Sequence, residues 1–287
     1  MPVNEADAEF RARQLVRETS PKSIPVSVEA YVQTVGAVLR IDPELGEDEP
    51  GWSFENKGKY YICVNANDSI ERQRFTICHE LAHIVLGLPS EHQEVPSWSH
   101  VKRTPNEISC DVFAAELLMP ATLFQPLVAI ESIGMESIDA LAKKALASFS
   151  ATGSRFANVA KAPCAFVFSE GGTVRYASRS TALRQANGWI PPRHILPEGS
   201  VAKRVRGGES CVEAEEVESD VWFADWQRGG ILLEQARHFQ RWDQTFALLW
   251  FEDDELPPPK PGSREEGDLG LKELDGILPW PGKKHRK

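Results

Sequence analysis

The stretch that decides the fold is "RFTICHELAH", residues 74–83, which places two histidines four residues apart in an apolar run. On an α-helix, residues four apart lie about 40° apart around the axis and about 6 Å apart along it. His79 and His83 therefore face one side, where both imidazoles can reach one ion. Glu80 is rotated by about 100°, onto the neighbouring flank, and can reach a water molecule without binding the ion. This spacing is typical of a zinc site with a general base.

The residues around this stretch predict a helix. "DSIE", residues 68–71, has the form of a capping box, with Asp68 as N-cap and Glu71 three residues later. Gly87 followed by Pro89 predicts its end. The alternative is an ordinary amphipathic helix with two polar residues on its exposed side. The strongly apolar flanks favour the metal site, because a buried polar group is costly unless it has a partner.

A catalytic zinc site has three protein ligands and one open position, so a third ligand is needed. The metzincin continuation requires Gly and His at the positions that Leu86 and Pro89 occupy, and is excluded. His92 and His100, in the polar segment that follows, are two candidates for the ligand.

A better candidate is Glu107 in "NEISCDVFAAELLMP", residues 106–120, a predicted helix that begins at Pro105. Asp111 lies four residues later on the same face, where its carboxylate can accept the N–H of a ligand histidine. Glu107 could instead be a first-turn acid that the helix dipole favours. In the same helix, Glu116 is predicted to be a solvated residue.

Composition limits the function classes. The 287 residues include 32 basic and 42 acidic ones, a formal net charge of −10, which argues against a broad nucleic-acid-binding surface. Residues 1–20 lack the apolar core of a signal peptide, and no stretch is apolar enough to span a bilayer. The five scattered cysteines form no disulfide framework, so we expect a cytoplasmic protein that does not bind membranes. Cys78 and Cys110 are predicted to be small buried residues, with a redox role as the alternative.

The pattern predicts an α+β chain of four parts. Residues 1–120 form a helical domain with a small sheet, including strands at 37–41 and 58–65 and helices at 4–18 and 27–37. Residues 121–162 form a helical segment with a helix-turn-helix cadence at 137–161. Residues 163–254 form a β-rich domain with strands at 164–169, 173–178, 220–226 and 245–251, the last of them central. Residues 255–287 form a Pro-rich, charged tail.

Together, residues 58–87 and 106–120 resemble the ImmA/IrrE family of zinc-dependent peptidases. That family pairs a strand ending in Asn, an "RxRFTxxHExxH" helix and a later "ExxxN-x-FAAxLLMP" helix; Asp111 stands at the Asn position here. The resemblance covers about residues 25–160 and implies a zincin-like fold. It implies zinc ligands His79, His83 and Glu107, with Glu80 as catalytic base. A His₂Glu site also suits Mn²⁺.

Members of this family cut helix-turn-helix repressors and relieve repression of mobile-element or stress genes. The resemblance thus implies a protein substrate of that kind, while the oligomeric state stays open. Lys143, Lys144, Arg155 and Lys161 give residues 137–161 mild basic character. We expect a structural or docking role for this segment rather than DNA reading.

The expected chemistry needs a hydrogen-bond donor for the oxyanion, and four residues are candidates: Tyr60, Tyr61, His92 and His100. Residues 59–65 are predicted to be an edge strand that pairs with the substrate. Two rival functions are a repressor-binding module with a structural metal and a DNA-binding regulator. The intact Glu80 argues against a purely structural metal, which would not need a water-activating carboxylate.

Overall fold

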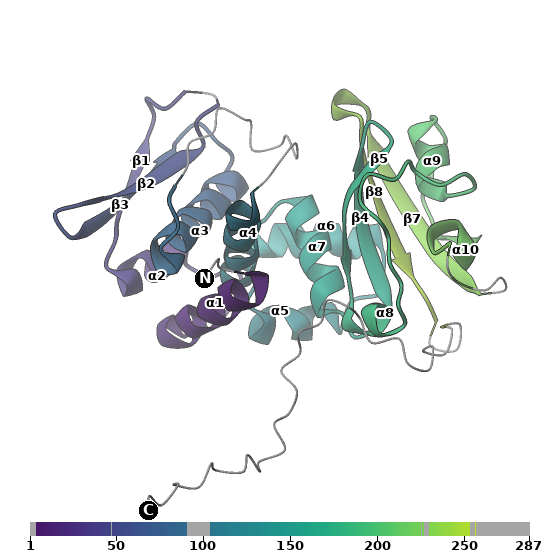
Figure 1. The fold of residues 1–287 in the computed structure, drawn as a ribbon, viewed down its shortest axis with the longest axis horizontal. Helices are drawn as coiled ribbons and strands as arrows, with labels where there is room; N and C mark the ends of the chain where they lie inside the picture. Colours follow the sequence, from purple (N-terminus) through teal and green to yellow (C-terminus); the bar gives the residue numbers. More distant parts are fainter. Residues whose placement is uncertain are drawn as a thin grey trace, which may run out of the picture.

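The computed structural model describes residues 4–46, 48–90, 104–224, 226, 230–252 and 256. These residues form ten α-helices and two sheets, which confirms the predicted α+β class. Figure 1 shows the two sheets at opposite ends of the molecule, with helices between them.

The first part carries a three-stranded sheet beside four helices: α1 (Glu5–Thr19), α2 (Val28–Val35), α3 (Ile70–Leu86) and α4 (Pro105–Leu118). The strands are β1 (Val38–Asp42), β2 (Gly51–Asn56) and β3 (Lys59–Asn65), in the order β1-β3-β2. Strand β3 pairs parallel with β1 and antiparallel with β2. The prediction that residues 59–65 form an edge strand is therefore wrong, because β2, which the sequence analysis missed, covers that edge.

Helix α3 begins one residue later than the capping box predicted. Its N-cap is Ser69, whose hydroxyl accepts a hydrogen bond from the N–H of Arg72. Asp68 instead forms an i,i+4 ion pair with Arg72, at 3.1 Å. The predicted end is confirmed, since Gly87 closes the helix with a positive φ of 67°.

Helix α1 packs on α4 through Ala8, Ala12, Leu15 and Val16. This helix agrees with the one predicted at residues 4–18. Ala6 and Phe10 lie on the exposed side, and Phe10 is 60% exposed.

The middle part consists of α5 (Ala121–Val128), α6 (Met135–Ala145) and α7 (Phe149–Val159). Helix α7, the second helix of the helix-turn-helix-like segment, packs against α5 and against β4 and β5 of the second sheet. A Cβ added at Gly153 would lie 2.3 Å from the ring of Phe166, so helix and sheet are in close contact there. The helix that would enter a DNA groove is thus largely buried.

The prediction that Glu116 is solvated is wrong, because the residue is only 2% exposed. Its carboxylate forms an ion pair with Arg155 of α7 and accepts a hydrogen bond from the N–H of Ala121, at 3.1 Å. Arg155, counted in the sequence as part of a basic surface, is itself buried and donates to the carbonyl of Met119.

The second sheet is antiparallel, with the order β5-β4-β8-β7-β6. Its strands are β4 (Cys164–Glu170), β5 (Thr173–Arg179), β6 (Glu215–Glu218), β7 (Ile231–Phe239) and β8 (Gln244–Trp250). The smaller helices are α8 (Thr181–Gln185), α9 (Val201–Arg206), α10 (Ser219–Trp222) and a 3₁₀ turn (Gln240–Trp242). The central position of residues 245–251 is confirmed, whereas the strand predicted at 220–226 is wrong, because its first residues belong to α10, Ser219–Trp222.

This sheet separates two hydrophobic cores. Phe166, Phe168 and Leu248 face the core that the helices of the first and middle parts share. Val167 and Leu249 face a second core with α8, α9 and α10. The domain boundaries at 120, 162 and 254 stay predictions, and the predicted tail lies almost wholly outside the described residues.

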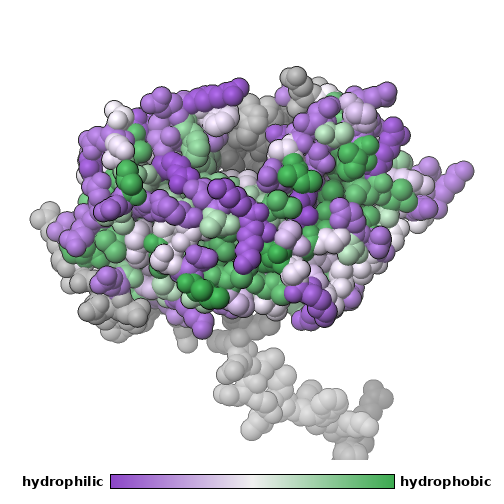
Figure 2. Space-filling view, turned by 180° about the vertical axis from the view of Figure 1, so that it is seen from behind, coloured by the Kyte–Doolittle hydropathy of each residue, from purple (hydrophilic) through white to green (hydrophobic). Residues whose placement is uncertain are grey.

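No single helix among the described residues is long and apolar enough to cross a bilayer; only α4 and α5 together pass that test, and they meet at a bend of 70°. Figure 2 shows the face opposite to that of Figure 1, where hydrophilic side chains are interrupted by patches of hydrophobic ones.

Glu234 is a fully buried carboxylate in the second core. It accepts hydrogen bonds from the N–H of Ala202 and from the indole N–H of Trp222, both at 2.8 Å. Burial raises the pKa of Glu234 above its ordinary value, although these donors oppose the shift. The folded state therefore binds this proton more tightly than the unfolded state does.

This shift predicts a pH effect on stability. The contribution of Glu234 to the free energy of unfolding is fully present at pH values below its ordinary pKa. It falls as the pH rises from that value through the raised pKa of the folded state. We expect Glu234→Gln, which has no charge to bury, to gain stability relative to the native protein across that window. Urea unfolding at a series of pH values measures the difference, and a difference independent of pH would contradict the prediction.

Candidate metal centre

The predicted ligands meet where α3 packs on α4. His79 and His83, one turn apart on α3, have their Nε2 atoms 3.2 Å apart. Glu107, in the first turn of α4, places Oε2 3.1 Å from Nε2 of His79 and Oε1 3.6 Å from Nε2 of His83. Thr104 is the N-cap of helix α4, and its hydroxyl accepts a hydrogen bond from the N–H of Glu107. The side chains of His79 and Glu107, which are 28 positions apart in the sequence, thus lie beside one another.

These distances fit one bound cation. Donor atoms at about 2.0–2.1 Å from a tetrahedral zinc ion lie about 3.3 Å from one another, close to the three separations observed. Asp111 lies 3.1 Å from Nδ1 of His79, which places the imidazole proton on that nitrogen and leaves the lone pair of Nε2 facing the other donors. Three lone-pair donors directed at one point are stabilised by a cation.

The surroundings keep His83 in its metal-binding form. It is 4% exposed, and burial, together with the neighbouring His79, lowers its pKa below the ordinary value. The imidazole is therefore neutral at pH 7, as a metal ligand must be. Its Nδ1 is buried and has no hydrogen-bond partner among the described residues.

Glu80 lies beside these ligands but outside their set, as the helical rotation predicts. Its Oε2 accepts hydrogen bonds from Ser53 of β2, at 2.6 Å, and from Ser90, at 3.2 Å. The side chain is 5% exposed. Sequence reasoning missed both serines, since β2 was not predicted and Ser90 lies beyond the helix end. The apolar residues around Glu80 in the sequence indicate that it is buried. Because a buried carboxylate needs hydrogen-bond donors, donors to Glu80 could have been expected.

The oxyanion candidates are placed differently from one another. Side chains alternate along a strand, and Ser53 pairs in register with Ile62, so Tyr60 shares the sheet face that is directed at α3. Tyr61 is on the opposite face, stacked on Phe54 with ring centroids 5.1 Å apart, which does not favour it as a donor. His92 and His100 lie outside the described residues.

Cys110 was predicted to be a small buried residue, with a redox role as the alternative, and the structure places it in this cluster. Its sulfur and one ring nitrogen each of His79 and His83 all lie within 4.8 Å of one another. Burial, followed by the charges of Glu107 and Glu80, raises the pKa of the thiol to about 12. Cys78 is also fully buried.

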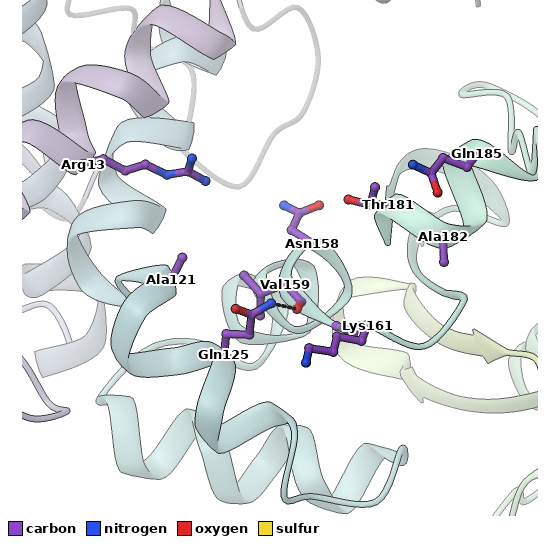
Figure 3. A pocket seen from close by; sticks show the side chains of 10 residues that line it. Arg13, Ala121, Gln125, Asn158, Val159, Lys161, Thr181, Ala182 and Gln185 are labelled. Atoms are coloured by element: carbon purple, nitrogen blue, oxygen red, sulfur yellow. Dashed lines mark hydrogen bonds between the residues drawn. The ribbon is translucent and has the colours of Figure 1, made fainter. Parts of the chain in front are cut away.

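A separate groove of about 430 Å³ lies between α1, α5, α7 and α8 (Figure 3). Its ionisable lining residues are Arg13 and Lys161, and Gln125 donates a hydrogen bond to the carbonyl of Val159 at its wall. None of the predicted site residues lines it, so it is not part of the candidate metal centre.

The position of Asp111 predicts its effect on metal binding. We expect Asp111→Ala to weaken zinc binding roughly 10- to 100-fold, because His79 loses the acceptor that fixes its orientation. Asp111→Asn should lose less zinc affinity, since its amide oxygen can still accept a hydrogen bond from the Nδ1–H of His79. Competition with a chromophoric chelator measures both affinities, and equal affinities for Asp111→Ala and the native protein would contradict this role.

The chain was compared with known proteins in three ways. The family model of the IrrE N-terminal-like domain, Peptidase M78, matches residues 32–156. A solved structure of a Mycobacterium tuberculosis transcriptional regulator is similar with a TM-score of 0.58 and 12% identity, over 86% of this chain and 77% of that chain, which shows a shared fold. Among curated proteins, no sequence match was found. The matched residues contain His79, Glu80, His83, Glu107 and Asp111. Residues 32–156 therefore match the IrrE N-terminal-like domain, Peptidase M78, which is the family that the ImmA/IrrE resemblance predicted.

Proposed function

We propose that the chain is a zinc-dependent endopeptidase that cleaves a helix-turn-helix repressor. The observation that carries the proposal is the separation of roles at the α3–α4 contact. Two imidazole nitrogens and one carboxylate converge within 3.1–3.6 Å. A second carboxylate, Glu80, is held beside them by two serine hydroxyls. A centre that serves only structure does not need this second carboxylate.

His79, His83 and Glu107 would hold the ion, and Asp111 would orient His79. A divalent cation bound there supplies Lewis acidity, which lowers the pKa of water and polarises a carbonyl. Glu80 takes the proton from the attacking water and later gives it to the leaving amine. The hydrogen bonds from Ser53 and Ser90 fix the Glu80 carboxylate in place for this transfer.

The geometry also supports a place for the substrate. Strand β2 is an edge of its sheet among the described residues, and its Ser53 contacts Glu80. An extended peptide that adds to the edge of β2 would run alongside Glu80 and gain main-chain hydrogen bonds whatever its sequence. The strand that presents the substrate is then β2 rather than β3.

The choice of a repressor as substrate rests on the family resemblance and on the likeness to a transcriptional regulator. The test is to incubate the full chain and Zn²⁺ or Mn²⁺ with a helix-turn-helix repressor encoded by a neighbouring gene. Mass spectrometry should then detect two repressor fragments, and none with Glu80→Gln. Stable repressor binding without fragments would support the rival binding module, and a salt-dependent DNA shift without proteolysis would support the DNA-binding regulator.

A further inference from the structure

Cys110 occupies a position from which it can reach the same ion as the histidines. It lies three residues after Glu107 on α4, and residues three apart share a helix face. Its side chain is fully buried, and its sulfur lies within 4.8 Å of a ring nitrogen of both His79 and His83. The catalytic scheme proposed above makes no use of this thiol.

We propose that Cys110 is a fourth protein ligand in the resting protein, so that the ion is held by two nitrogens, one carboxylate and one sulfur. The proposal rests on the metal centre of the proposed function and adds its regulation. On binding, the S–H bond breaks, the proton goes to solvent and a sulfur–metal bond forms, with no change in oxidation state.

The distances allow this ligation with a small adjustment. With bond lengths of about 2.3 Å to sulfur and 2.0–2.1 Å to nitrogen, a tetrahedral site separates sulfur from nitrogen by about 3.6 Å. The observed sulfur–nitrogen separations are no more than 4.8 Å, which is longer than this by about 1.2 Å at most, and rotation about the single side-chain torsion of cysteine changes such separations by amounts of this size.

A sulfur ligand has two consequences. Thiolate favours Zn²⁺ over Mn²⁺, so Cys110 would decide between the two metals that a His₂Glu site accepts. A fourth protein ligand also fills the position where the attacking water would bind. The resting centre would then be closed, and substrate or water must displace the sulfur or add a fifth ligand before cleavage.

Cys78 provides a matched control. It is a buried cysteine on α3 and directly precedes His79, but it lies at the contact with α2, where its charge would act on Tyr31. Its sulfur does not belong to the group formed by His79, His83 and Cys110. Cys78→Ser therefore tests the effect of removing a buried thiol from this region without removing the proposed ligand.

The experiment loads the metal-free full chain with Co²⁺ and records its absorption spectrum. Native protein and Cys78→Ser should show the visible bands of tetrahedral cobalt together with a near-ultraviolet sulfur-to-cobalt charge-transfer band. Cys110→Ser should keep the visible bands and lose the charge-transfer band. Cys110→Ala, which adds no polar group to the helix contact, should give the same loss.

Each outcome separates the two proposals. Visible bands without a charge-transfer band in the native protein would refute the sulfur ligand and leave the His₂Glu centre intact. A charge-transfer band that persists in both Cys110 variants would also refute it. The absence of all these bands from the native protein would remove the metal centre, and with it the proposed function.

Discussion

Replacing Glu80 by glutamine is expected to reduce peptide cleavage by at least about 100-fold, because a general base contributes roughly 10²- to 10⁴-fold to such reactions. Glutamine has nearly the same shape, and its amide oxygen can still accept from Ser53 and Ser90, which contact Oε2 of Glu80. What it loses is the ability to take a proton from water. The three predicted ligands are unchanged, so the variant should bind zinc as the native protein does.

Glu71→Gln is the matched control for this experiment. It makes the same chemical change on the same helix, in the first turn, more than two turns from Glu80. Its cleavage rate and zinc content should equal those of the native protein. Cleavage is measured by mass spectrometry of the repressor and zinc content by atomic emission. Unreduced cleavage by Glu80→Gln would remove Glu80 from the mechanism, and loss of zinc would place it among the ligands.

The main part of the candidate centre could be predicted because its geometry is local. The spacing of His79 and His83 on one helix fixes their shared face whatever surrounds it. The link to Glu107 is not local, and helical geometry left His92 and His100 as alternatives. The family resemblance, carried by the two motifs together, implied Glu107 as the third ligand.

The order of the small sheet could not be predicted in this way. "GWSFEN", residues 51–56, follows an acidic, turn-rich segment and has only one polar residue between its aromatic ones. Its pairing with β3 depends on contacts that no local pattern encodes, since strand preference reflects the neighbours that a strand acquires. Without β2, neither the edge of the sheet nor Ser53 could be identified.

Contacts with distant residues also explain why residues 220–226 do not form the predicted strand. Their aromatic content is typical of a strand, but Trp222 and Phe223 fill the second core from the short helix α10 and the turn after it. The indole of Trp222 donates to the buried Glu234, twelve residues away. Tertiary packing, rather than local preference, decides the conformation here.

Glu116→Ala is expected to lower the free energy of unfolding by about 3–5 kcal/mol, because it leaves a buried guanidinium without its carboxylate. The side chains of Glu116 and Arg155 are only 3% and 6% exposed. Glu116 also accepts from the N–H of Ala121, at the start of α5, where the N-cap Pro120 offers no side-chain acceptor. One carboxylate thus joins α4, α5 and α7. Urea unfolding followed by circular dichroism measures the loss.

Asp7→Ala serves as the control, since Asp7 forms a 3.3 Å ion pair with Arg11 on α1, with both side chains more than 40% exposed, and its loss should cost about 0–1 kcal/mol. If Glu116→Ala cost no more than this, Glu116 would be solvated, as its sequence position suggested.

The double variant Glu116→Leu/Arg155→Met should recover most of the loss, because it removes both buried charges and replaces them with apolar volume. With the single variants Glu116→Leu and Arg155→Met measured as well, the difference between the double variant and the sum of these two is the coupling energy of the pair. A large coupling energy would mean that α7 is tied to the peptidase helices by charge as well as by packing. That attachment keeps the buried face of α7 in the core, and so away from any DNA groove.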